Sequence, residues 1–579
     1  MTAEHETPGR RSLAIVIDQL ARDFPSRTVC KAPTGTKATD GFSAVTMKQL
    51  SKAVDSTAAL IENSLGIAAE DEVLLYLGDN DIRYLVFVVA CQKTGYKAFL
   101  PSMKNTMDVQ AALIERTGCS GIAFSASYAE EAHRVGEAAG SRMASPPLLG
   151  LPSFEEMVGS FSHQFPYGIS YEDIEDRCAI IIHSSGTTGV PKPIPLTHGY
   201  LGVMDRQTQV PIPEGRQSAV PNQLGPDDLF LSTAPFFHIM GIFAQLMSVF
   251  HGTPFVQPPA SASPLTVDTL VQTIETARPT AAVIVPSLIE QAGRSRTALE
   301  TLSTLRMVCI GGAPLAPEIG AALNARTDLV SLMGMSELGL VLSLVPEHKE
   351  DWEYFEWNPA YEVRMDPVGG GESTDDSSNT LYELVIPRGR NRDIHGIFHT
   401  LPHLKTEFRT QDLFSAHPTR QTLWKYEGRA DDTITLINGT KISPVPLEKT
   451  VEGHELVARA VVIGQGRSRT AVLVEPVPGC SKADELLRDS ASAVDGDRSH
   501  SSVSAFARAI WPAVEQANGL VSEGAGIGLM RIAVAVPDKP FRTTPKGSTQ
   551  RRKVLADYKQ EIDRLYERDE YWHNMLRNG

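Results

Sequence analysis

Short apolar runs alternate with segments of helical periodicity along roughly the first 345 residues of the chain. Apolar positions recur at near-helical spacing from Phe42 to Leu65, and a second helix is expected to begin within Ile82–Val89. The continuous runs are typical of strands buried on both faces of a parallel sheet. They are Glu72–Leu77, Ala179–Ile182, Ala282–Val285 and Arg306–Ile310. This alternation predicts an α/β fold.

The pattern changes after about residue 430, where short strands are expected at Ala460–Ile463, Ala471–Val474 and Ile532–Val536. Helices are predicted over Ser504–Asn518 and Arg552–Tyr566. The second of these has one apolar face, made by Val554, Leu555, Tyr558, Ile562 and Leu565. The sequence therefore predicts a large α/β domain over residues 1–428 and a small α+β domain over residues 429–579. Polar stretches at 211–228, 366–379 and 481–502 indicate loops or an exposed insertion.

Composition narrows the range of partners. The 579 residues include 54 Lys and Arg against 69 Asp and Glu, a net charge of −15, which disfavours nucleic acid as a partner. The longest apolar stretches, Tyr84–Ala90 and Ile242–Phe250, are far shorter than the roughly 20 residues of a membrane span. Six cysteines without a CxxC pair predict buried free thiols. Because Met1–Arg11 has no apolar signal segment, we expect a cytoplasmic protein.

The segment Ser184–Lys192, Ser-Ser-Gly-Thr-Thr-Gly-Val-Pro-Lys, is the strongest chemical signal. It follows the predicted strand Cys178–His183 and precedes a helix expected from Thr197. Glycines let backbone N–H groups approach an anion, hydroxyls add donors and Lys192 adds charge, so the segment is suited to bind phosphates. It is not a Walker loop, because Gly-Lys-Ser/Thr is absent at the required spacing. The alternative interpretation is a polar surface turn.

Ser184–Lys192 resembles the phosphate-loop signature of the adenylate-forming superfamily, which includes acyl- and aryl-CoA synthetases and the adenylation domains of peptide synthetases. Further family-like motifs follow the same order along the chain. They are Lys93–Pro101, Pro235–Gly241, Gly311–Pro314, Gly334–Glu337, Phe408–Asp412 and Gly428–Asp431. The resemblance implies a large domain of several sheets with helices and a small mobile C-terminal lid.

The closer resemblance is to the adenylation domain of fungal reductases that are built like a short peptide synthetase. Three stretches carry it: Gly95–Ser102 together with Asn105, Phe398–Pro402 continuing into Phe408–Phe414, and Asn438–Glu448. Members of the superfamily activate a carboxylic acid with ATP as an acyl-adenylate and usually pass the acyl group to a thiol. ATP and Mg²⁺ are therefore the expected cofactors.

The resemblance also assigns roles to individual residues. Phosphate contacts fall on Ser184, Ser185, Gly186, Thr187, Thr188, Gly189 and Lys192. Other nucleotide contacts fall on Gly312, Ala313, Met333, Ser336, Asp412 and Arg429, of which Asp412 and Arg429 hold the ribose. The acid is expected beside His238, Ile239, Gly311 and Gly334. Glu337 would hold Mg²⁺, Asp431 would be the hinge, and Lys546 would be the lysine of adenylate formation, with Glu337 and His238 also in catalytic positions.

Several residues depart from the family pattern or have plainer interpretations. Pro193, Met333, Ser336 and Gln411 replace the usual glycine, aromatic, threonine and glycine. His238 is open to interpretation as a core histidine, Glu337 as a solvated acid, and Asp412 as an ion-pair partner of Arg409. Lys546 precedes Gly547 instead of following a glycine, so a solvated loop cation and the competing Lys553 stay open.

The residue after His238 bears on the substrate. Peptide-synthetase domains that take α-amino acids place an Asp in this motif to pair with the ammonium group, whereas this chain has Ile239. An acid without an α-amino group is expected, most simply an aryl acid. Only thirteen residues follow Tyr566, and no carrier serine motif is visible. The predicted thiol is the phosphopantetheine arm of a carrier protein; the alternatives are a standalone acyl- or aryl-CoA synthetase and a degenerate ATP/AMP-binding module.

Overall fold

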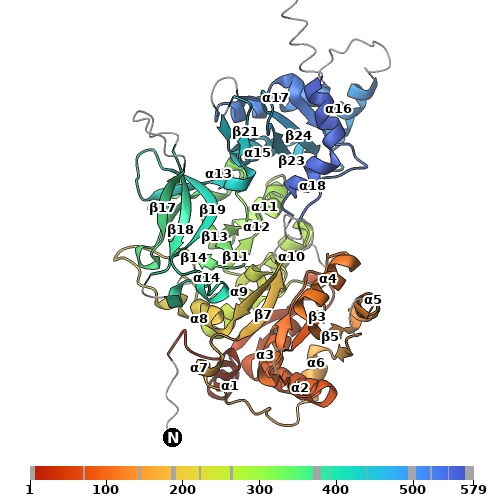
Figure 1. Cartoon of the computed structure of the whole chain (residues 1–579), viewed down its shortest axis with the longest axis vertical. Helices are drawn as coiled ribbons and strands as arrows, with labels where there is room; N and C mark the ends of the chain where they lie inside the picture. Colours follow the sequence, from red (N-terminus) through yellow and green to blue (C-terminus); the bar gives the residue numbers. More distant parts are fainter. Residues whose placement is uncertain are drawn as a thin grey trace, which may run out of the picture.

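The structure is a computed structural model, and it describes most of the chain (Figure 1). The described residues are 7–69, 72–140, 145–183, 191–220, 223–260, 265–368, 380–389, 392–438, 440–492, 504–521, 525–544 and 547–567. The predicted phosphate-loop residues Ser184–Gly189 lie outside these ranges, and so does Lys546.

A six-stranded sheet forms much of the N-terminal third. Its strands, in spatial order, are β6 (Leu148–Leu151), β5 (Cys119–Ser125), β3 (Val73–Leu77), β4 (Lys97–Phe99), β7 (Cys178–His183) and β8 (Pro193–Thr197). All of its neighbours are parallel except β7 and β8. Alternate residues of β3 enter two different cores: Leu74 and Tyr76 pack in one, and Val73, Leu75 and Leu77 pack in the other. Burial on both faces explains why this strand reads as a continuous apolar run.

A second, eight-stranded sheet continues the α/β body. Its order is β14 (Gly339–Val341), β13 (Asp328–Met335), β12 (Met307–Gly311), β11 (Ala281–Ile284), β9 (Phe230–Ser232), β10 (Phe255–Val256), β1 (Thr28–Pro33) and β2 (Phe42–Thr46). Here too successive residues of β12 alternate between two cores, with Met307 and Cys309 on one side and Val308 and Ile310 on the other. The continuous run Arg306–Ile310 is thus a central strand, as predicted.

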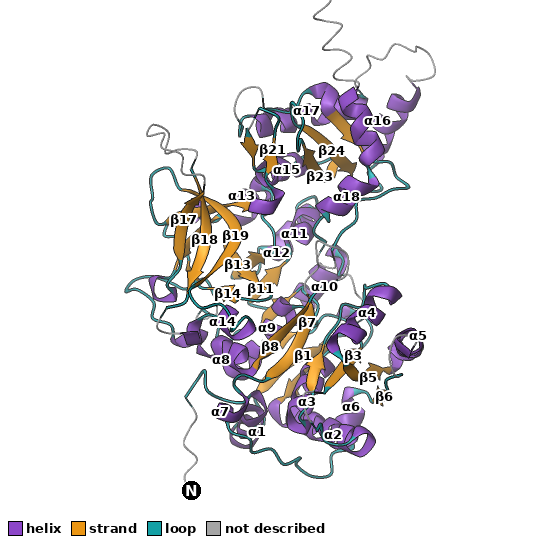
Figure 2. Ribbon diagram, viewed as in Figure 1, coloured by secondary structure: helices purple, strands orange, loops and turns teal. Residues whose placement is uncertain are grey.

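A third sheet is six-stranded and antiparallel, with the order β15 (Ser343–Leu344), β16 (Tyr354–Trp357), β20 (Leu423–Arg429), β19 (Glu407–Ala416), β18 (Leu381–Pro387) and β17 (Arg364–Val368). It lies beside the second sheet (Figure 2). Residues 366–368 of a stretch predicted to be a loop belong to β17. In this sheet β19 and β20 carry the Phe408–Asp412 and Gly428–Asp431 motifs to one edge of the second sheet.

Helices cover the sheets of the N-terminal part. They are α1 (Leu13–Asp23), α2 (Met47–Leu65), α3 (Arg83–Thr94), α4 (Met107–Thr117), α5 (Ala129–Gly140), α6 (Phe154–Gly159), α7 (Tyr171–Ile174), α8 (His198–Arg206), α9 (Ile239–Phe250), α10 (Val267–Ala277), α11 (Pro286–Ala292), α12 (Arg296–Leu302), α13 (Pro317–Asn324) and α14 (Ile397–Thr400). Single-turn 3-10 segments lie between several of them, among them Ala430–Asp432.

The elements after residue 432 gather at one end of the long axis of the molecule, drawn in blue at the top of Figure 1. They are β21 (Ile434–Thr435), β22 (Lys441–Ile442), α15 (Pro444–Glu452), β23 (Val457–Ile463), β24 (Ala471–Pro476), α16 (Ser481–Ser492), α17 (Ala505–Asn518), β25 (Ile532–Val534) and α18 (Arg551–Asp557), followed by helical residues 559–567. Their apolar residues form two cores of their own, one on each face of β24. Val554, Tyr558, Ile562 and Leu565 are buried in one of them, which matches the predicted apolar face.

One local prediction was wrong, and two were incomplete. Phe42–Thr46 is the edge strand β2 and not the start of a helix, because α2 begins only at Met47, where Thr46 and Gln49 form a capping box. The predicted insertion 481–502 begins with the helix α16. The segment after β7 does not lead directly into a helix: β8 intervenes and pairs antiparallel with β7, and α8 starts afterwards with Thr197 as its N-cap.

The six cysteines are free thiols, as predicted; four of them are buried, whereas Cys178 and Cys480 are partly exposed and not buried as expected. None of the helices in the described part of the chain combines the length and apolarity that a bilayer crossing requires.

Candidate active site

A cavity of about 230 Å³ lies where β12 and β13 of the second sheet meet β16, β19 and β20 of the third. Five of the predicted nucleotide residues line it: Gly312, Ala313, Met333, Asp412 and Arg429. The predicted acyl-site residue Gly334 lines it as well. The other lining residues are Ile310, Pro314, Leu315, Ser331, Leu332, Met335, Trp352, Glu353, Phe355, Lys425 and Tyr426. Motifs that are a hundred residues apart in the sequence thus meet at one cavity.

Asp412 is the buried acid of this cavity, with 4% of its surface exposed. Among the described residues, its carboxylate has only long contacts: the Tyr426 hydroxyl donates to Oδ1 over 3.5 Å, and Arg429 lies 4.0 Å away. Burial raises the pKa of Asp412 to about 7, and the positive charge of Arg429 opposes this rise only in part. A buried carboxylate with spare acceptor capacity fits a ligand that brings hydroxyl donors, as a ribose does.

Arg429 lies opposite Asp412 in the β19–β20 ladder. Its Nε donates to Asp431 Oδ1 at 3.1 Å, so the guanidinium is shared between the cavity and the turn that follows β20. Arg409 has no part in this arrangement. Among the described residues it pairs with Asp366, Glu383 and Glu407. The alternative interpretation of Asp412 as the partner of Arg409 is therefore wrong.

Gln411, which replaces the family glycine, adopts a left-handed backbone with φ of 63°. This region is costly for residues with a Cβ and free for glycine, which explains the usual glycine at the position. The Gln411 N–H donates to Glu383 Oε1 at 3.0 Å, and that bond helps to hold the turn before Asp412. The departure from the family pattern therefore leaves the local backbone shape intact.

The glycine turn after β12 and the end of β13 form the opposite wall of the cavity. Gly312 has φ of 88°, another left-handed residue, so glycine is required there for conformational reasons. At Gly334 an added Cβ would lie 2.7 Å from the carbonyl oxygen of Gly339, because β13 and β14 approach closely. Met333 lines the cavity with a half-buried thioether, and aromatic lining comes instead from Trp352, Phe355 and Tyr426.

Ser336 and Glu337 follow β13 directly, outside the residues that line the cavity. The Ser336 carbonyl accepts a hydrogen bond from the Tyr200 hydroxyl at 3.1 Å, and Glu337 is half-buried nearby. Among the described residues, the one group of three His, Cys, Asp or Glu side chains close enough to share an ion is Glu175, Asp393 and His399, and none of them lines the cavity. A single carboxylate such as Glu337 suits Mg²⁺ that keeps phosphate and water ligands.

His238 and Ile239 lie at the start of α9. The Met240 N–H donates to His238 Nδ1 at 3.3 Å, so the imidazole caps the helix, while Ile239 is buried in the main core. Gly241 of the same motif packs against the Pro235 carbonyl, where a Cβ would clash. Gly311 lines the larger cavity described below, and neither His238 nor Ile239 lines one of the cavities described here. Their contact with the acid stays a prediction.

The described part of the phosphate segment is its end. β7 and β8 form the two arms of a hairpin, and Lys192 is exposed immediately before β8. The order strand–loop–strand differs from the strand–loop–helix expected, so the dipole of a directly following helix does not contribute. Phosphate binding by Ser184–Gly189 and Lys192 stays a prediction.

The described residues on the two sides of Lys546 lie close together. Thr543 and Thr549 form an antiparallel bridge, and the Gly547 N–H donates to the Thr544 carbonyl at 2.9 Å. Gly547 has φ of 85°, and a Cβ there would lie 2.6 Å from Ser287 Oγ of α11. The loop from the C-terminal part thus touches the N-terminal part. Lys553, the competing lysine, is exposed on α18.

Sequence reasoning missed Phe355, Lys425 and Tyr426 as lining residues. Lys425 and Tyr426 stand just before the Gly428–Asp431 motif, so their closeness to it was the available signal. Phe355 offered none, because it reaches the cavity only through the pairing of β16 with β20.

An α/β body of two sheets, an antiparallel sheet that presents a buried acid beside a glycine turn, and a small α+β part that contacts the body define an enzyme of the adenylate-forming class. The chain belongs to the AMP-binding enzyme family. That family matches residues 17–359, and its C-terminal domain matches residues 431–570. The resemblance inferred from the motifs is confirmed.

The relatives are fungal. A carboxylic acid reductase of Neurospora crassa is 28% identical over 98% of this chain and 52% of its own length. The adenylate-forming reductase Nps11 of Serpula lacrymans is 29% identical over 88% of this chain and 45% of its own length. The chain therefore spans about half the length of these relatives.

Among solved structures, the A domain of carboxylic acid reductase from Segniliparus rugosus, in complex with AMP and a co-purified carboxylic acid, superposes with a TM-score of 0.70. It is 18% identical, and the match covers 97% of this chain and 95% of that one. The anthranilate CoA ligase AuaEII gives a TM-score of 0.69 at 14% identity, covering 95% and 98%. These likenesses confirm the predicted fold class.

Proposed function

We propose that this chain activates a carboxylic acid with ATP. A carboxylate oxygen attacks the α-phosphorus and forms a new P–O bond, while the bond to the bridging oxygen breaks and pyrophosphate leaves with its electron pair. The products are an acyl-adenylate and pyrophosphate, and no atom changes its oxidation state. The observation that carries this proposal is the buried carboxylate of Asp412 facing the cavity between Gly312, Met333 and Tyr426.

Asp412 and Arg429 would bind the ribose, and Gly312, Ala313, Met333 and Ser336 would border the adenine. Ser184–Gly189 and Lys192 would contact phosphates, and Lys546 would place a cation between the carboxylate and the α-phosphate, where negative charge concentrates. Glu337 would hold Mg²⁺, which when bound reduces the repulsion between the two anions. Supporting the role of Lys546, its neighbour Gly547 lies against Ser287, and both residues line a cavity that Gly311 and Gly312 also line.

Residues 1–428 would act as the core domain and 429–579 as a lid that turns about Asp431. Asp431 lies in the single-turn segment between β20 and β21 and contacts both sides of it: Arg429 before the turn and Arg552 of α18 at 3.4 Å. A few residues at such a junction are sufficient to absorb a rotation between two half-reactions.

The acid would be an aryl acid that lacks an α-amino group. Ile239 occupies the position where an acidic side chain would pair with an ammonium group, and it is 7% exposed. An ammonium group buried against an isoleucine would lose its hydration without gaining a partner. His238, Gly311 and Gly334 would border the same substrate.

The acyl group would pass to the phosphopantetheine thiol of a carrier protein. Two comparisons support this choice over free CoA: the fungal reductases are about twice as long as this chain, and the solved A-PCP didomain of the carboxylic acid reductase from Segniliparus rugosus has a TM-score of 0.71. The thioester forms when the thiol sulfur attacks the acyl carbon and AMP leaves.

Substrate-dependent exchange of labelled pyrophosphate into ATP tests the proposal. We expect exchange with benzoic or hydroxybenzoic acids at least tenfold above that with amino acids or fatty acids. Robust exchange with a free amino acid and none with an aryl acid would overturn the substrate assignment, and no exchange with any acid would indicate a nucleotide-binding module. Thioester formation with CoA alone, and none with a carrier protein, would favour a CoA synthetase.

A further inference from the structure

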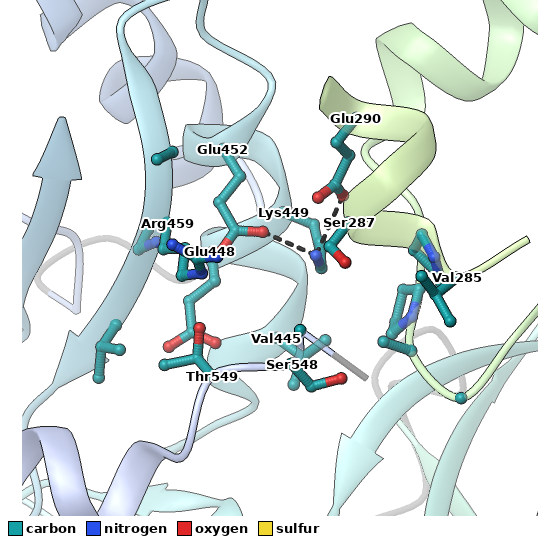
Figure 3. A pocket seen from close by; sticks show the side chains of 18 of the residues that line it. Val285, Ser287, Glu290, Val445, Glu448, Lys449, Glu452, Arg459, Ser548 and Thr549 are labelled. Atoms are coloured by element: carbon teal, nitrogen blue, oxygen red, sulfur yellow. Dashed lines mark hydrogen bonds and ion pairs between the residues drawn. The ribbon is translucent and has the colours of Figure 1, made fainter. Parts of the chain in front are cut away.

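A second, larger cavity of about 530 Å³ lies between the two parts of the chain. On one side it is lined by α11 and the glycine turn after β12, and on the other by α15, β23 and the segment that precedes α18. The charged residues on its walls are Glu290 and Arg294 from the N-terminal part and Asp432, Glu448, Lys449, Glu452, Arg459 and Arg551 from the segment after β20. Figure 3 shows Glu290 of α11 and Lys449 and Glu452 of α15 pointing toward one another.

Lys449 is the centre of this cluster. Its Nζ lies 2.7 Å from Glu452 Oε2, one turn further along α15, and 3.1 Å from Glu290 Oε1 on α11 (Figure 3). All three side chains are largely buried, with exposed fractions of 17%, 7% and 9%. Burial alone would lower the pKa of Lys449, but the two carboxylates outweigh it and raise that pKa, so Lys449 is a cation here.

Glu290 and Glu452 each accept a backbone hydrogen bond from their own part of the molecule. The Ala316 N–H, just before α13, donates to Glu290 Oε1 at 3.2 Å. The Ala460 N–H in β23 donates to Glu452 Oε1 at 3.0 Å. Lys449 therefore connects two rigidly held carboxylates, and only its bond to Glu290 crosses between the two parts.

The same orientation of the two parts produces two further contacts. Arg294, one turn after Glu290, donates to the Val457 carbonyl at 2.7 Å. Gly547, next to Lys546, lies against Ser287, one turn before Glu290. The ion pair and the Lys546 loop thus contact the same short helix, α11. If the C-terminal part turned away, Glu290 would lose its cation and Ser287 would lose the loop together.

We propose that Glu290 and Lys449 are positioning residues for the first half-reaction: their ion pair holds the C-terminal part where the Lys546 loop meets the acyl and phosphate groups. This inference rests on the proposed function of Lys546, and it adds that the ion pair supports the first half-reaction and not the second. Weakening the pair favours the turned orientation, so adenylate formation slows while thioester formation is spared.

The N-terminal part contains a matched control. Lys93 on α3 also binds two carboxylates, Asp18 at 2.8 Å and Asp55 at 2.7 Å, and all three side chains are buried. This triad lies wholly within the N-terminal part, on α1, α2 and α3. Asp55→Asn therefore removes the same kind of charge from the same kind of cluster without touching the contact between the parts.

The kinetic experiment compares Glu290→Gln, Lys449→Met, their combination and Asp55→Asn. We expect Glu290→Gln to lower acid-dependent pyrophosphate exchange at least tenfold and to leave thioester formation from a supplied acyl-adenylate within twofold of the parent. The double variant should exchange pyrophosphate no more slowly than the less active single variant, because both single variants remove the Glu290–Lys449 interaction. Asp55→Asn should change both half-reactions equally, if at all. Equal losses in both half-reactions for Glu290→Gln would overturn the proposal.

A measurement without turnover separates this inference from the proposed function. Donor and acceptor dyes are attached through Arg296→Cys on α12 and Lys482→Cys on α16, whose side chains are 89% and 64% exposed, after alanine replaces Cys178 and Cys480. Single-molecule energy transfer should show one main population in the parent and in Asp55→Asn. In Glu290→Gln, the fraction of molecules in this main population should fall to half or less. An unchanged distribution of energy-transfer efficiencies in Glu290→Gln would refute the positioning role of the Glu290–Lys449 pair, whether or not any acid is activated.

Discussion

Asp412 and Arg429 lie opposite each other in the β19–β20 ladder, yet the nearest atoms of their charged groups are 4.0 Å apart. Arg429 directs its Nε to Asp431 instead. The described residues therefore compensate the negative charge of this buried acid only in part. A nucleotide whose ribose donates two hydrogen bonds would complete the arrangement, and the first two predictions follow from this.

Asp412→Asn should weaken ATP binding at least tenfold while the chain remains folded. Hydrogen bonds to a charged acceptor contribute about 1.5–3 kcal/mol each, so weakening two of them exceeds a factor of ten. Isothermal titration gives the Kd, and far-UV circular dichroism confirms the fold. Asp366→Asn, which changes a partly exposed acid of the same sheet, is the control. Unchanged ATP affinity in a folded Asp412→Asn variant would remove Asp412 from the site.

Binding of adenosine should strengthen as the pH rises from 6 to 8. The pKa of Asp412 is raised to about 7, and only the ionised carboxylate accepts hydrogen bonds from both ribose hydroxyls. Below pH 7 the affinity for adenosine should therefore fall by up to about tenfold for each pH unit. Adenosine is chosen because it does not titrate in this range. The trend should vanish in Asp412→Asn, and its persistence there would assign it to another group.

The same group affects the stability of the ligand-free protein. Because the folded-state pKa of Asp412 lies above its ordinary value of 3.8, its stabilising contribution is complete below that value and is lost as the pH rises through about 7. The loss amounts to about 4 kcal/mol at most. Chemical unfolding of the parent should therefore show a decline between pH 5 and pH 8 that Asp412→Asn reduces. Parallel pH profiles for the two proteins would contradict this.

Lys546→Ala should abolish acid-dependent pyrophosphate release, whereas Lys553→Ala should leave it within about twofold, because Lys553 is exposed on α18. Thioester formation from a supplied acyl-adenylate should survive in both variants. The assay is rapid-quench measurement of labelled pyrophosphate. The reverse pattern, with Lys553→Ala inactive and Lys546→Ala active, would show that the loop had been assigned in the wrong register.

Gln411→Gly should keep or slightly raise the free energy of unfolding, and Gln411→Val should lower it by about 1–3 kcal/mol. Glycine relieves the left-handed strain at φ of 63° but adds entropy to the unfolded chain, whereas a β-branched residue increases the strain. Denaturant titration of the three proteins measures the order. A Gln411→Val variant as stable as the parent would show that the turn relaxes to another conformation.

The fold could be predicted best where one strand serves two cores. Val73–Leu77 and Met307–Gly311 are apolar at every position because alternate residues enter different cores, and both were recognised. Strand β2 was missed, because its two exposed positions and its continuity with α2 resemble a helical spacing. Strand β8 was missed because Pro193 and Pro195 are poor strand formers away from an edge.

The site residues that belong to sequence motifs could also be predicted, whereas those brought together only by the fold could not. Asp412, Arg429 and Met333 were identified from motifs, and the structure brings them to one cavity. The pair Glu290–Lys449 had no local signal, because 159 residues separate its members and each is an unremarkable charge on its own helix. The pair becomes apparent only in the folded chain, where α11 and α15 line the same cavity. The left-handed backbone of Gln411 could not be predicted either, because glutamine rarely adopts this conformation and so gives no local signal for it.

The hairpin that flanks the phosphate segment also ends its sheet, since β8 is the last strand in the order and pairs only with β7. Pro193 and Pro195 alternate along it, and proline in an edge strand turns its missing N–H away from the neighbouring strand. A further strand pairing with β8 would therefore lack two backbone N–H donors, those that Pro193 and Pro195 do not have. The edge of the sheet next to the predicted phosphate segment is therefore a poor partner for a strand of a second polypeptide, which protects the chain from intermolecular β-aggregation.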